Sequence, residues 1–397
     1  MESIKDRVAI IGMGCTKFGE RWESDIEDLL VEAAYEAYAD AGIEPKDIQA
    51  AWYGTQNNVV SGQPLAHALK LEYIPITRCE NFCCTGTDAL RNACYAVAAG
   101  VYDIVMAAGV EKLKDAPYTG LVGAAGGPGG RDPTGVEPAA APPVQFALLA
   151  NRYSYHYGIP MPELKKALAR IAVKNHKNGA LNPKAHFQRE ITMEQALNAP
   201  MIAYPLGLFD CCGVSDGSGV AIVTRPDIAK KLKGDQYILV KGLGLCCGAH
   251  QGTLQDDYDF VHIPENIAAS KMAYADAGIT DPLEQIDHAM VHDCFSITEL
   301  VIMEDLGFAP RGKAPEYEHD GVFDMDGKLA VNIDGGLKCF GHPIGGSGIR
   351  MIYEVYLQLL GRAGPRQRPN PSLGLTHNLG GLPGSFTGAV TIWGRGN

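Results

Sequence analysis

One segment of the chain occurs twice without a single substitution. Residues 37–43 and residues 273–279 both read Ala-Tyr-Ala-Asp-Ala-Gly-Ile. In each copy an apolar-periodic helix leads into the segment, its glycine (Gly42 or Gly278) ends that helix, and a short strand follows. The repeat therefore predicts that the chain consists of two halves of one design.

The two halves continue with the same alternation of helices and strands. Helices that alternate with short buried strands are typical of layered α/β proteins. We therefore expect two α/β units that pack about a pseudo-twofold axis. The expected helices cover residues 29–38 and 267–274, and the expected strands cover residues 48–53, 104–108 and 219–224 in the first half and 286–291, 373–376 and 388–393 in the second.

A second match between the halves pairs a cysteine with a histidine. Residues 83–91 read Cys-x-x-Gly-x-x-Ala-Leu-Arg, and residues 342–350 read His-x-x-Gly-x-x-Gly-Ile-Arg. Each segment leads into a long helical pattern, so Cys83 and His342 stand at corresponding helix starts. A pseudo-twofold axis would bring these two helix N-termini together at the centre of the molecule.

A long insertion separates the strands of the first half. It opens with a Gly/Ala/Pro-rich run over residues 120–143 and continues into two helical stretches, which predicts a flexible cover over a site. Residues 151–190 carry eight Lys and Arg against two Glu, a balance that suits either an anionic ligand or a solvated helix face. The predicted domains are a first half over residues 1–113 and 206–235, a cover over 114–205, and a second half over 236–397.

Charge and composition exclude several classes of protein. The net charge of −12 argues against nucleic acid as a partner. No apolar run approaches membrane-spanning length, and residues 1–7 carry charges where a secretory peptide needs apolar residues. We expect a cytoplasmic protein without a membrane partner. The eleven cysteines include vicinal pairs and lack zinc-finger spacing, so we expect reduced thiols and no metal site.

Cys83 and His342 are the first candidates for chemistry. An isolated cysteine at a helix start is more often a packing residue, but the positive end of a helix lowers the pKa of a thiol and suits a nucleophile. The duplication places His342, on a glycine-lined turn, opposite Cys83. Its ring could accept the proton of the Cys83 thiol, which predicts a Cys–His pair.

Two further polar loops follow predicted strands of the second half. His292-Asp293-Cys294-Phe295 comes directly after one strand, and His377-Asn378-Leu379-Gly380-Gly381 after another, where α/β sheets gather functional side chains. The glycines of the second loop permit a backbone N–H to point into a cavity. A third glycine-containing segment, residues 12–14, lacks the third glycine of a nicotinamide-binding loop, so we interpret it as a strand-end turn.

These motifs resemble the thiolase superfamily, in particular the sterol-carrier-protein type of thiolase. The resemblance spans nearly the whole chain and implies a thiolase-like fold, in which duplicated βαβαβαββ halves form a five-layered αβαβα arrangement with an inserted cover. The matching segments are Cys83-x-Thr85-Gly86, His292-Asp293-Cys294-Phe295, Gly341-His342-Pro343, His377-Asn378-Leu379-Gly380, and residues 173–176 and 180–183 of the cover.

The resemblance also implies a role for each site residue. Cys83 would take the acyl group, His342 would activate it, and Cys294 would serve as acid and base. His292 and His342 would hold a thioester oxygen. The backbone N–H groups of Cys83 and Gly380 would hold the oxyanion of the tetrahedral intermediate.

The activity that follows from these roles is the cleavage of a 3-oxoacyl-CoA by CoA, or the reverse Claisen condensation. CoA would be a co-substrate, and no cofactor would be bound permanently. Lys174, His176 and Lys184 are the candidates for CoA contacts. The resemblance further implies a homodimer and, as in some relatives, a small zinc-binding OB-fold partner subunit.

Two departures from the family pattern leave the substrate open. Cys84 stands where Ala or Ser is usual, and residues 382–386 replace a run of glycines. They leave room for a bulky or aromatic acyl group such as that of benzoylsuccinyl-CoA, with acetoacetyl-CoA as the alternative. A ketosynthase-like enzyme, a retro-aldolase and a non-catalytic acyl-CoA-binding subunit are the rival functions.

Overall fold

The fold is built around ten strands that run in one hydrogen-bonded order through both halves. The computed structural model describes residues 3–56, 61–115, 142–254 and 258–396. The strand order is β3-β2-β4-β7-β1 followed by β8-β12-β11-β9-β10. The bounds are β1 Ala9–Cys15, β2 Ala50–Gly54, β3 Ile76–Cys79, β4 Ile104–Lys112, β7 Asp216–Thr224, β8 Ile238–Cys247, β9 His288–Met290, β10 Ala330–Val331, β11 Leu373–Leu382 and β12 Ser385–Arg395.

The helices and the two remaining short strands complete the described elements. The helices are α1 Ile26–Ala41, α2 Gln63–Leu69, α3 Thr85–Ala98, α4 Pro142–Tyr157, α5 Met161–Ala180, α6 Met193–Leu197, α7 Pro226–Lys233, α8 Gln251–Leu254, α9 Pro264–Ala277, α10 Pro282–Gln285, α11 Ser296–Asp305, α12 Ala314–His319, α13 Gly336–Cys339 and α14 Ile344–Leu359, and the short strands are β5 Met201–Ala203 and β6 Leu206–Gly207. No helix of the described segments is long and apolar enough to cross a membrane.

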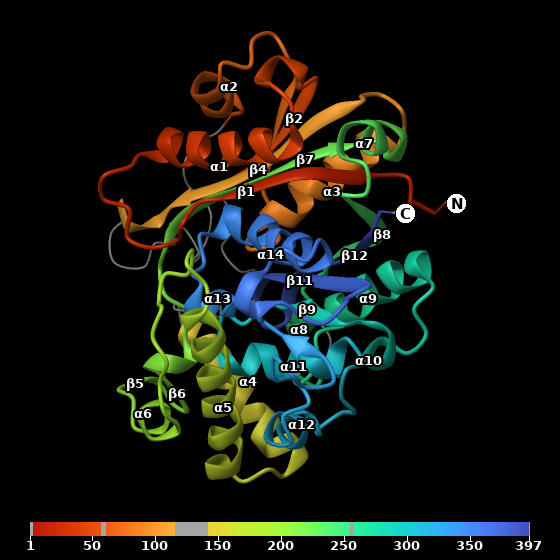
Figure 1. The fold of residues 1–397 in the computed structure, drawn as a ribbon. Helices are drawn as coiled ribbons and strands as arrows, with labels where there is room; N and C mark the ends of the chain where they lie inside the picture. The colour runs from red at the N-terminus through yellow and green to blue at the C-terminus, as the bar shows by residue number, and fades with distance from the viewer. Residues whose placement is uncertain (1–2, 57–60, 116–141, 255–257, 397) are drawn as a thin grey trace.

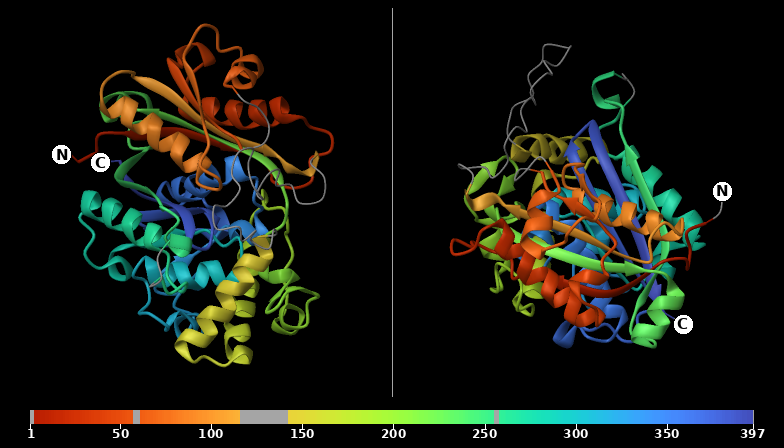
Figure 2. Two further views of the ribbon diagram at one scale, coloured as in Figure 1. Left: turned by 180° about the vertical axis from the view of Figure 1, so that it is seen from behind. Right: turned by 90° about the horizontal axis from the view of Figure 1, so that it is seen from above.

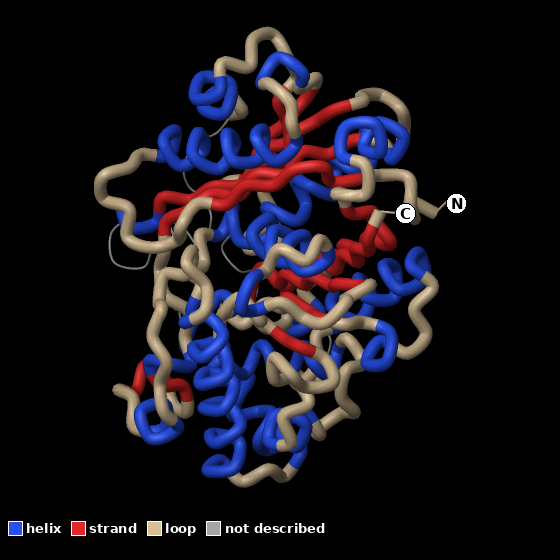
Figure 3. The backbone as a smooth tube through the Cα atoms, viewed as in Figure 1, coloured by secondary structure: helices blue, strands red, loops and turns tan. Residues whose placement is uncertain are grey.

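The two halves use their strands in the same order, counted from the outer edge inward. Within the described segments, the strand ladder between the two five-stranded halves consists of two residue pairs of β1 and β8, Ala9 with Leu239 and Ile10 with Ile238. The predicted duplication and its α/β architecture are confirmed. Figure 1 shows the two bands of strands one above the other, and Figure 3 shows helices above, between and below them.

The central helices belong to one half each but share a single layer. Helix α14 packs against β4 and β7 of the first half and against β9 and β11 of the second. Helix α3 packs against α14, and α1 and α9 cover the outer faces of the two half-sheets, as the reverse view in Figure 2 also shows. Helix, sheet, helix, sheet and helix therefore make five layers, as predicted.

The repeated segment has a packing explanation. A Cβ atom on Gly12 of β1 would lie 2.5 Å from the carbonyl oxygen of Ala37, and one on Gly242 of β8 would lie 2.1 Å from that of Ala273. Helices α1 and α9 can lie this close to their strands only because glycine faces alanine. The interpretation of residues 12–14 as a strand-end turn is therefore wrong, since these residues lie inside β1.

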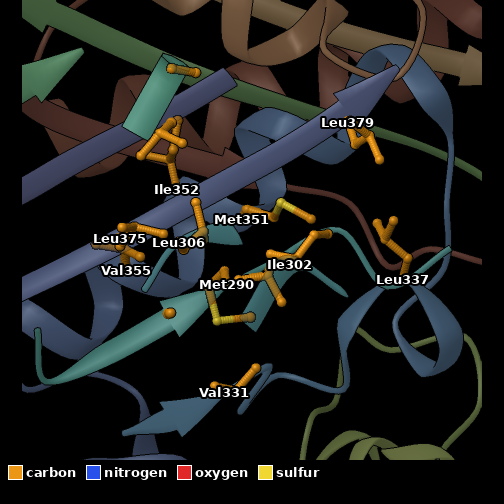
Figure 4. Close-up of a cluster of buried hydrophobic side chains, with 14 of the residues drawn as sticks. Met290, Ile302, Leu306, Val331, Leu337, Met351, Ile352, Val355, Leu375 and Leu379 are labelled. Atoms are coloured by element: carbon orange, nitrogen blue, oxygen red, sulfur yellow. The ribbon is translucent and has the colours of Figure 1, made fainter. Parts of the chain in front are cut away.

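Buried aliphatic residues fill the space between the second half-sheet and its helices. Met290 of β9, Leu375 of β11 and Val355 of α14 belong to one buried cluster, which Figure 4 shows in close-up. This packing fixes the strand ends of β9 and β11, from which the candidate site is built. Strand β11 runs on to Leu382, so residues 377–381, which were predicted as a loop after the strand, lie inside it, and Gly381 has a positive φ of 102°.

The cover packs on the second half through its longest helix. Helix α5 contacts α11, α12 and α13 and also the short helix α6. The Gly/Ala/Pro-rich run that opens the predicted cover falls almost entirely on residues 116–141, which lie outside the described residues. The described part of the cover is thus a set of helices docked on the second half.

Candidate active site

Cys83 stands at the N-terminus of α3, on a tight loop. Phe82 has a positive φ of 48°, a conformation that few side chains adopt. The hydroxyl of Thr85 holds this loop, because it accepts a hydrogen bond from the backbone N–H of Asn81 at 2.9 Å and donates one to the carbonyl of Phe82 at 2.5 Å. The helix N-terminus behind Cys83 presents its positive end to the thiol.

Gly380 lies against this loop from the side of β11. A Cβ atom there would lie 2.7 Å from Cβ of Phe82, 2.8 Å from the carbonyl oxygen of Asn81 and 2.9 Å from the backbone nitrogen of Cys83. Only glycine fits this position. The backbone of β11 at Gly380 is thereby brought next to the backbone N–H of Cys83. The predicted oxyanion donors are the N–H groups of these two residues.

His342 is held in one tautomer. Its Nε2 lies 3.3 Å from Sγ of Cys83, and its Nδ1 lies 2.8 Å from Oγ of Ser347. The Ser347 hydroxyl donates its only proton to the carbonyl of Pro343 at 2.9 Å, so it accepts from Nδ1–H of His342. Nε2 therefore carries the lone pair and can accept the proton of the Cys83 thiol. Ser347 was not singled out from the sequence, although it lies in the first turns of α14, five residues after His342.

His292 completes a compact group with the Cys–His pair. Its ring meets that of His342 edge to face at a centroid distance of 5.1 Å. The donor atoms of Cys83, His292 and His342 lie within 4.8 Å of one another. Such a set of two imidazoles and a thiol could hold a zinc ion, and it equally suits a site in which a thiol attacks and two rings bind an oxygen.

Cys294 lies buried on the same loop as His292. Its Sγ is 3.6 Å from Oγ1 of Thr298, and its carbonyl accepts a hydrogen bond from the backbone N–H of Cys212 at 2.8 Å. Cys211 forms a bridge with Phe295, so Cys212 lies directly across from Cys294. Cys212 was missed as a neighbour of the site, and its vicinal pairing in the sequence was the only signal.

Burial sets the charge of these groups. It raises the pKa of both Cys83 and Cys294 above that of an ordinary thiol. Burial, assisted by the Arg350 guanidinium, lowers the pKa of His342 to about 3, and burial lowers the pKa of His292 well below its usual value. The expectation of a low Cys83 pKa is therefore not met in the free site, because loss of hydration outweighs the helix dipole. The resting pair is a neutral thiol beside a neutral imidazole.

Asp293, between His292 and Cys294, organises the backbone around the site. Its carboxylate accepts hydrogen bonds from the backbone N–H of Leu337 and Lys338 at the start of α13, and from Nδ2 of Asn175 at 2.8 Å. The amide of Asn175 also reaches Glu299 on α11 at 2.9 Å. The second half thus binds the cover through a buried polar network.

The three candidates for CoA contacts are occupied inside the protein. Lys174 is buried and forms ion pairs with Glu299 and Glu318. Nδ1 of His176 lies 3.0 Å from the carbonyl of Arg189, and Nζ of Lys184 pairs with the carboxylate of Glu36. The structure therefore does not support Lys174, His176 or Lys184 as phosphate ligands. The matching segment of the cover anchors α5 instead.

Two family models match the chain. The model described as the thiolase N-terminal domain matches residues 8–227, and the model described as the thiolase C-terminal domain-like matches residues 248–394. Together they cover both halves and the residues of the candidate site.

Several curated proteins are similar over almost the whole of this chain. The acetyl-CoA acetyltransferase of Methanothermobacter thermautotrophicus is 38% identical over 98% of this chain and 99% of its own. The benzoylsuccinyl-CoA thiolase subunit BbsB of Thauera aromatica is 33% identical over 95% of this chain and 96% of its own. Sterol carrier protein 2 of Bos taurus is 29% identical over 98% of this chain, which spans 72% of that protein.

Solved structures share the fold. An Ltp2-ChsH2(DUF35) aldolase matches with a TM-score of 0.82 and 26% identity over the whole of both chains. Human mitochondrial 3-ketoacyl-CoA thiolase matches with a TM-score of 0.71 over the whole of both chains, at 16% identity.

Proposed function

The chain belongs to the thiolase family and is an acyltransferase, and from this premise we propose that it cleaves a 3-oxoacyl-CoA with CoA through an acyl-Cys83 intermediate. The observation that carries the proposal is the 3.3 Å distance between Nε2 of His342 and Sγ of Cys83, with Nδ1 held by Ser347. Nε2 has no proton in this arrangement, so it can accept one at the moment of attack.

The first half-reaction uses both thiols. Cys83 attacks the 3-oxo carbon and gives its proton to His342, and the bond between C2 and C3 breaks. Cys294 gives its proton to C2, which releases acetyl-CoA and leaves an acyl group on Cys83. The raised pKa of Cys294 supports this role, because a neutral thiol is the form that can donate.

The second half-reaction restores both thiols. The thiol of CoA gives its proton to the Cys294 thiolate, and its sulfur attacks the acyl group on Cys83. The expelled Cys83 thiolate takes back the proton from His342. Every proton is returned, and the sequence read backwards is a Claisen condensation.

Charge on oxygen is stabilised in two places in this proposal. His292, together with the Nε2–H that His342 carries after taking the proton, would hold the thioester oxygen of the departing acetyl-CoA. The backbone N–H groups of Cys83 and Gly380 would hold the oxyanion on the attacked carbon, a role that the close packing of Gly380 on the Cys83 loop supports.

We propose acetoacetyl-CoA as the first substrate to test. Two relatives at 38% and 37% identity, both over at least 95% of this chain, are named acetyl-CoA acetyltransferase. The second candidate is an aryl 3-oxoacyl-CoA of the benzoylsuccinyl type, which the relative at 33% identity supports. A thiolysis assay across short, branched and aryl 3-oxoacyl-CoAs ranks the two by kcat/KM.

The retro-aldolase alternative differs in the fate of Cys83. An aldolase leaves the cysteine unmodified, whereas a thiolase acylates it. Mass spectrometry of the peptide that contains Cys83, after incubation with a 3-oxoacyl-CoA without CoA, distinguishes them. An unmodified peptide in an active sample contradicts the proposed function.

The enzyme assembles as a homodimer in this proposal. Strand β3 is an edge strand whose only strand neighbour among the described residues is β2, and the nearby side chain of Phe82 is 48% exposed. A second copy would cover both. Analytical ultracentrifugation measures the mass directly.

A small zinc-binding OB-fold subunit is the further partner we propose. A relative is named as a subunit, and a similar solved structure pairs its aldolase with a DUF35 protein. Full turnover by the pure chain contradicts a requirement for this partner.

We also propose a cytoplasmic location. All eleven cysteines are free, as is usual for proteins of a reducing compartment.

A further inference from the structure

Two buried polar atoms beside the site lack a partner among the residues that the structure describes. They are Nδ2 of Asn378 on β11 and Nδ1 of His292 after β9. Both side chains are completely or almost completely buried. An amide N–H and an imidazole nitrogen form a complementary pair if the ring nitrogen carries a lone pair.

The strand register brings these two residues to the same edge of the sheet. Strands β9 and β11 are parallel, and their last ladder pair joins Thr376 to Met290. Two residues beyond this pair, β11 continues to Asn378, and the chain that leaves β9 continues to His292. Asn378 points to the same face of β11 as Thr376, because residues two apart on a strand share a face.

That face is the inner one, toward the central helices. The hydroxyl of Thr87 on α3 donates to Oδ1 of Asn378 at 2.6 Å. On the neighbouring strand, the ring of His288 lies close to Gly374 and Val355, on the side of α14. His292 follows His288 by four residues, and its ring meets His342 at the start of α14.

The contact with Thr87 orients the amide of Asn378. Because Oδ1 accepts from the Thr87 hydroxyl, Nδ2 points to the other side of the amide plane. Its two N–H groups are donors, and no described residue accepts either of them. The amide is therefore fixed at its oxygen by Thr87, and its nitrogen has no acceptor among the described residues.

We propose that Asn378 is a positioning residue that donates from Nδ2 to a bridging water, which in turn donates to Nδ1 of His292 and so keeps the proton of the ring on Nε2. The proposal rests on the proposed function, in which His292 donates to a substrate oxygen. It assigns opposite tautomers to the two rings: His342 presents a lone pair on Nε2 to the Cys83 thiol, and His292 presents an N–H to the substrate.

The test is the tautomer of His292, measured by ¹⁵N NMR on protein labelled at histidine. The signals of His292 are identified by their loss in His292→Asn. In the wild-type protein we expect an unprotonated Nδ1 and a protonated Nε2. In Asn378→Asp the carboxylate attracts a proton to Nδ1, so the two nitrogen shifts exchange or the ring becomes charged.

Activity gives the second readout. Asn378→Leu is expected to lower kcat by about tenfold to a hundredfold, the range typical for partners that orient a catalytic ring, with KM for CoA unchanged. In Asn378→Asp the pH profile of kcat gains a new acid limb. Thr376→Val, a buried polar change on the same strand, is the control and leaves the tautomer and kcat unchanged.

Two results overturn the proposal. One is a wild-type His292 with its proton on Nδ1, and the other is an Asn378→Asp protein whose His292 shifts equal those of the wild type. The NMR measurement needs no substrate. An inactive protein with the expected tautomer therefore refutes the proposed function and leaves the Asn378 inference standing.

Discussion

Cys83 and His342 are 259 residues apart in the chain, and their Sγ and Nε2 atoms lie 3.3 Å apart. Each stands at the N-terminus of a central helix, and the two helices come from different halves. A general base from one half and a nucleophile from the other thus form a single reacting pair.

Ser347→Ala tests how this pair is prepared. Without the Ser347 hydroxyl, the proton of His342 is free to move to Nε2, where it cannot accept from Cys83. We expect alkylation of Cys83 by iodoacetamide to slow by about tenfold, within the range of general-base contributions. Ser270→Ala, a buried serine on α9 that donates to a local carbonyl, is the control. An unchanged rate in Ser347→Ala contradicts the assigned tautomer.

Cys294→Ala separates the two thiols. The variant should lose thiolysis, because no group remains to protonate C2 and to deprotonate CoA. A single acyl transfer from an acyl-CoA to Cys83 should survive at a reduced rate, since Cys83 and His342 still carry out the attack and the departing CoA thiolate can take its proton from water. Single-turnover mass spectrometry and a steady-state thiolysis assay measure the two steps. Normal thiolysis by Cys294→Ala would remove Cys294 from the mechanism.

Gly380→Ala tests the close packing of β11 on the Cys83 loop. The new methyl group would lie under 3 Å from three backbone or side-chain atoms of residues 81–83, so the loop has to shift. We expect thiolysis to fall by about a hundredfold, the loss typical of one displaced oxyanion donor. Gly207→Ala is the matched control, because its nearest neighbour would be 3.4 Å away. Equal activity of the two variants would show that the loop tolerates the shift.

Lys174→Met tests the structural role of the cover helix. It leaves Glu299 and Glu318 without their buried cation, and we expect a loss of about 3–5 kcal/mol in the free energy of unfolding. Lys177→Met, at an exposed position on the same helix, should change stability little. Urea unfolding measures both. A KM for CoA that rises in Lys174→Met without a loss of stability would restore this residue as a ligand.

The buried histidines predict a loss of stability in acid. Burial lowers the pKa of His377 to about 3, whereas an unfolded histidine titrates near 6.5. Its contribution is therefore complete above pH 6.5 and falls as the pH drops from 6.5 toward 3, by about 1.4 kcal/mol per pH unit for each such histidine.

The variant His377→Gln isolates this effect. It keeps a donor for Asn266 but cannot titrate, so the fall in unfolding free energy between pH 6.5 and 5 should be shallower than in the wild type. His319→Gln, at an exposed ring, should leave the slope unchanged. Equal slopes in all three proteins would show that His377 is not the group responsible.

Much of the fold was predictable because the sequence contains an internal duplication. The repeated segment and the match between Cys83 and His342 gave the duplication, the central helices and the main reacting pair. Strand ends were less predictable. Strand β11 continues through Gly380 because β12 pairs with it up to Leu382, and such pairing between strands cannot be deduced from one segment.

The polar residues around the site were the hardest to predict. Lys174 was predicted to bind phosphate because it lies in a basic segment. Its ammonium group instead pairs with Glu299 and Glu318, which are more than a hundred residues away in the sequence. Asn378 and Cys212 are of interest because of the residues that lie near them in space. The sequence shows what kind of side chain each residue has, but it does not show which distant residues that side chain contacts.

The narrow seam between β1 and β8 has a consequence for how the enzyme matures. Among the described residues the strand ladder between the half-sheets has two residue pairs, and α14 packs on strands of both halves. The nucleophile and its base meet only when this docking is complete. A chain with both halves folded but undocked would therefore lack a general base beside Cys83, and the rate at which Cys83 regains reactivity during refolding would report this docking step.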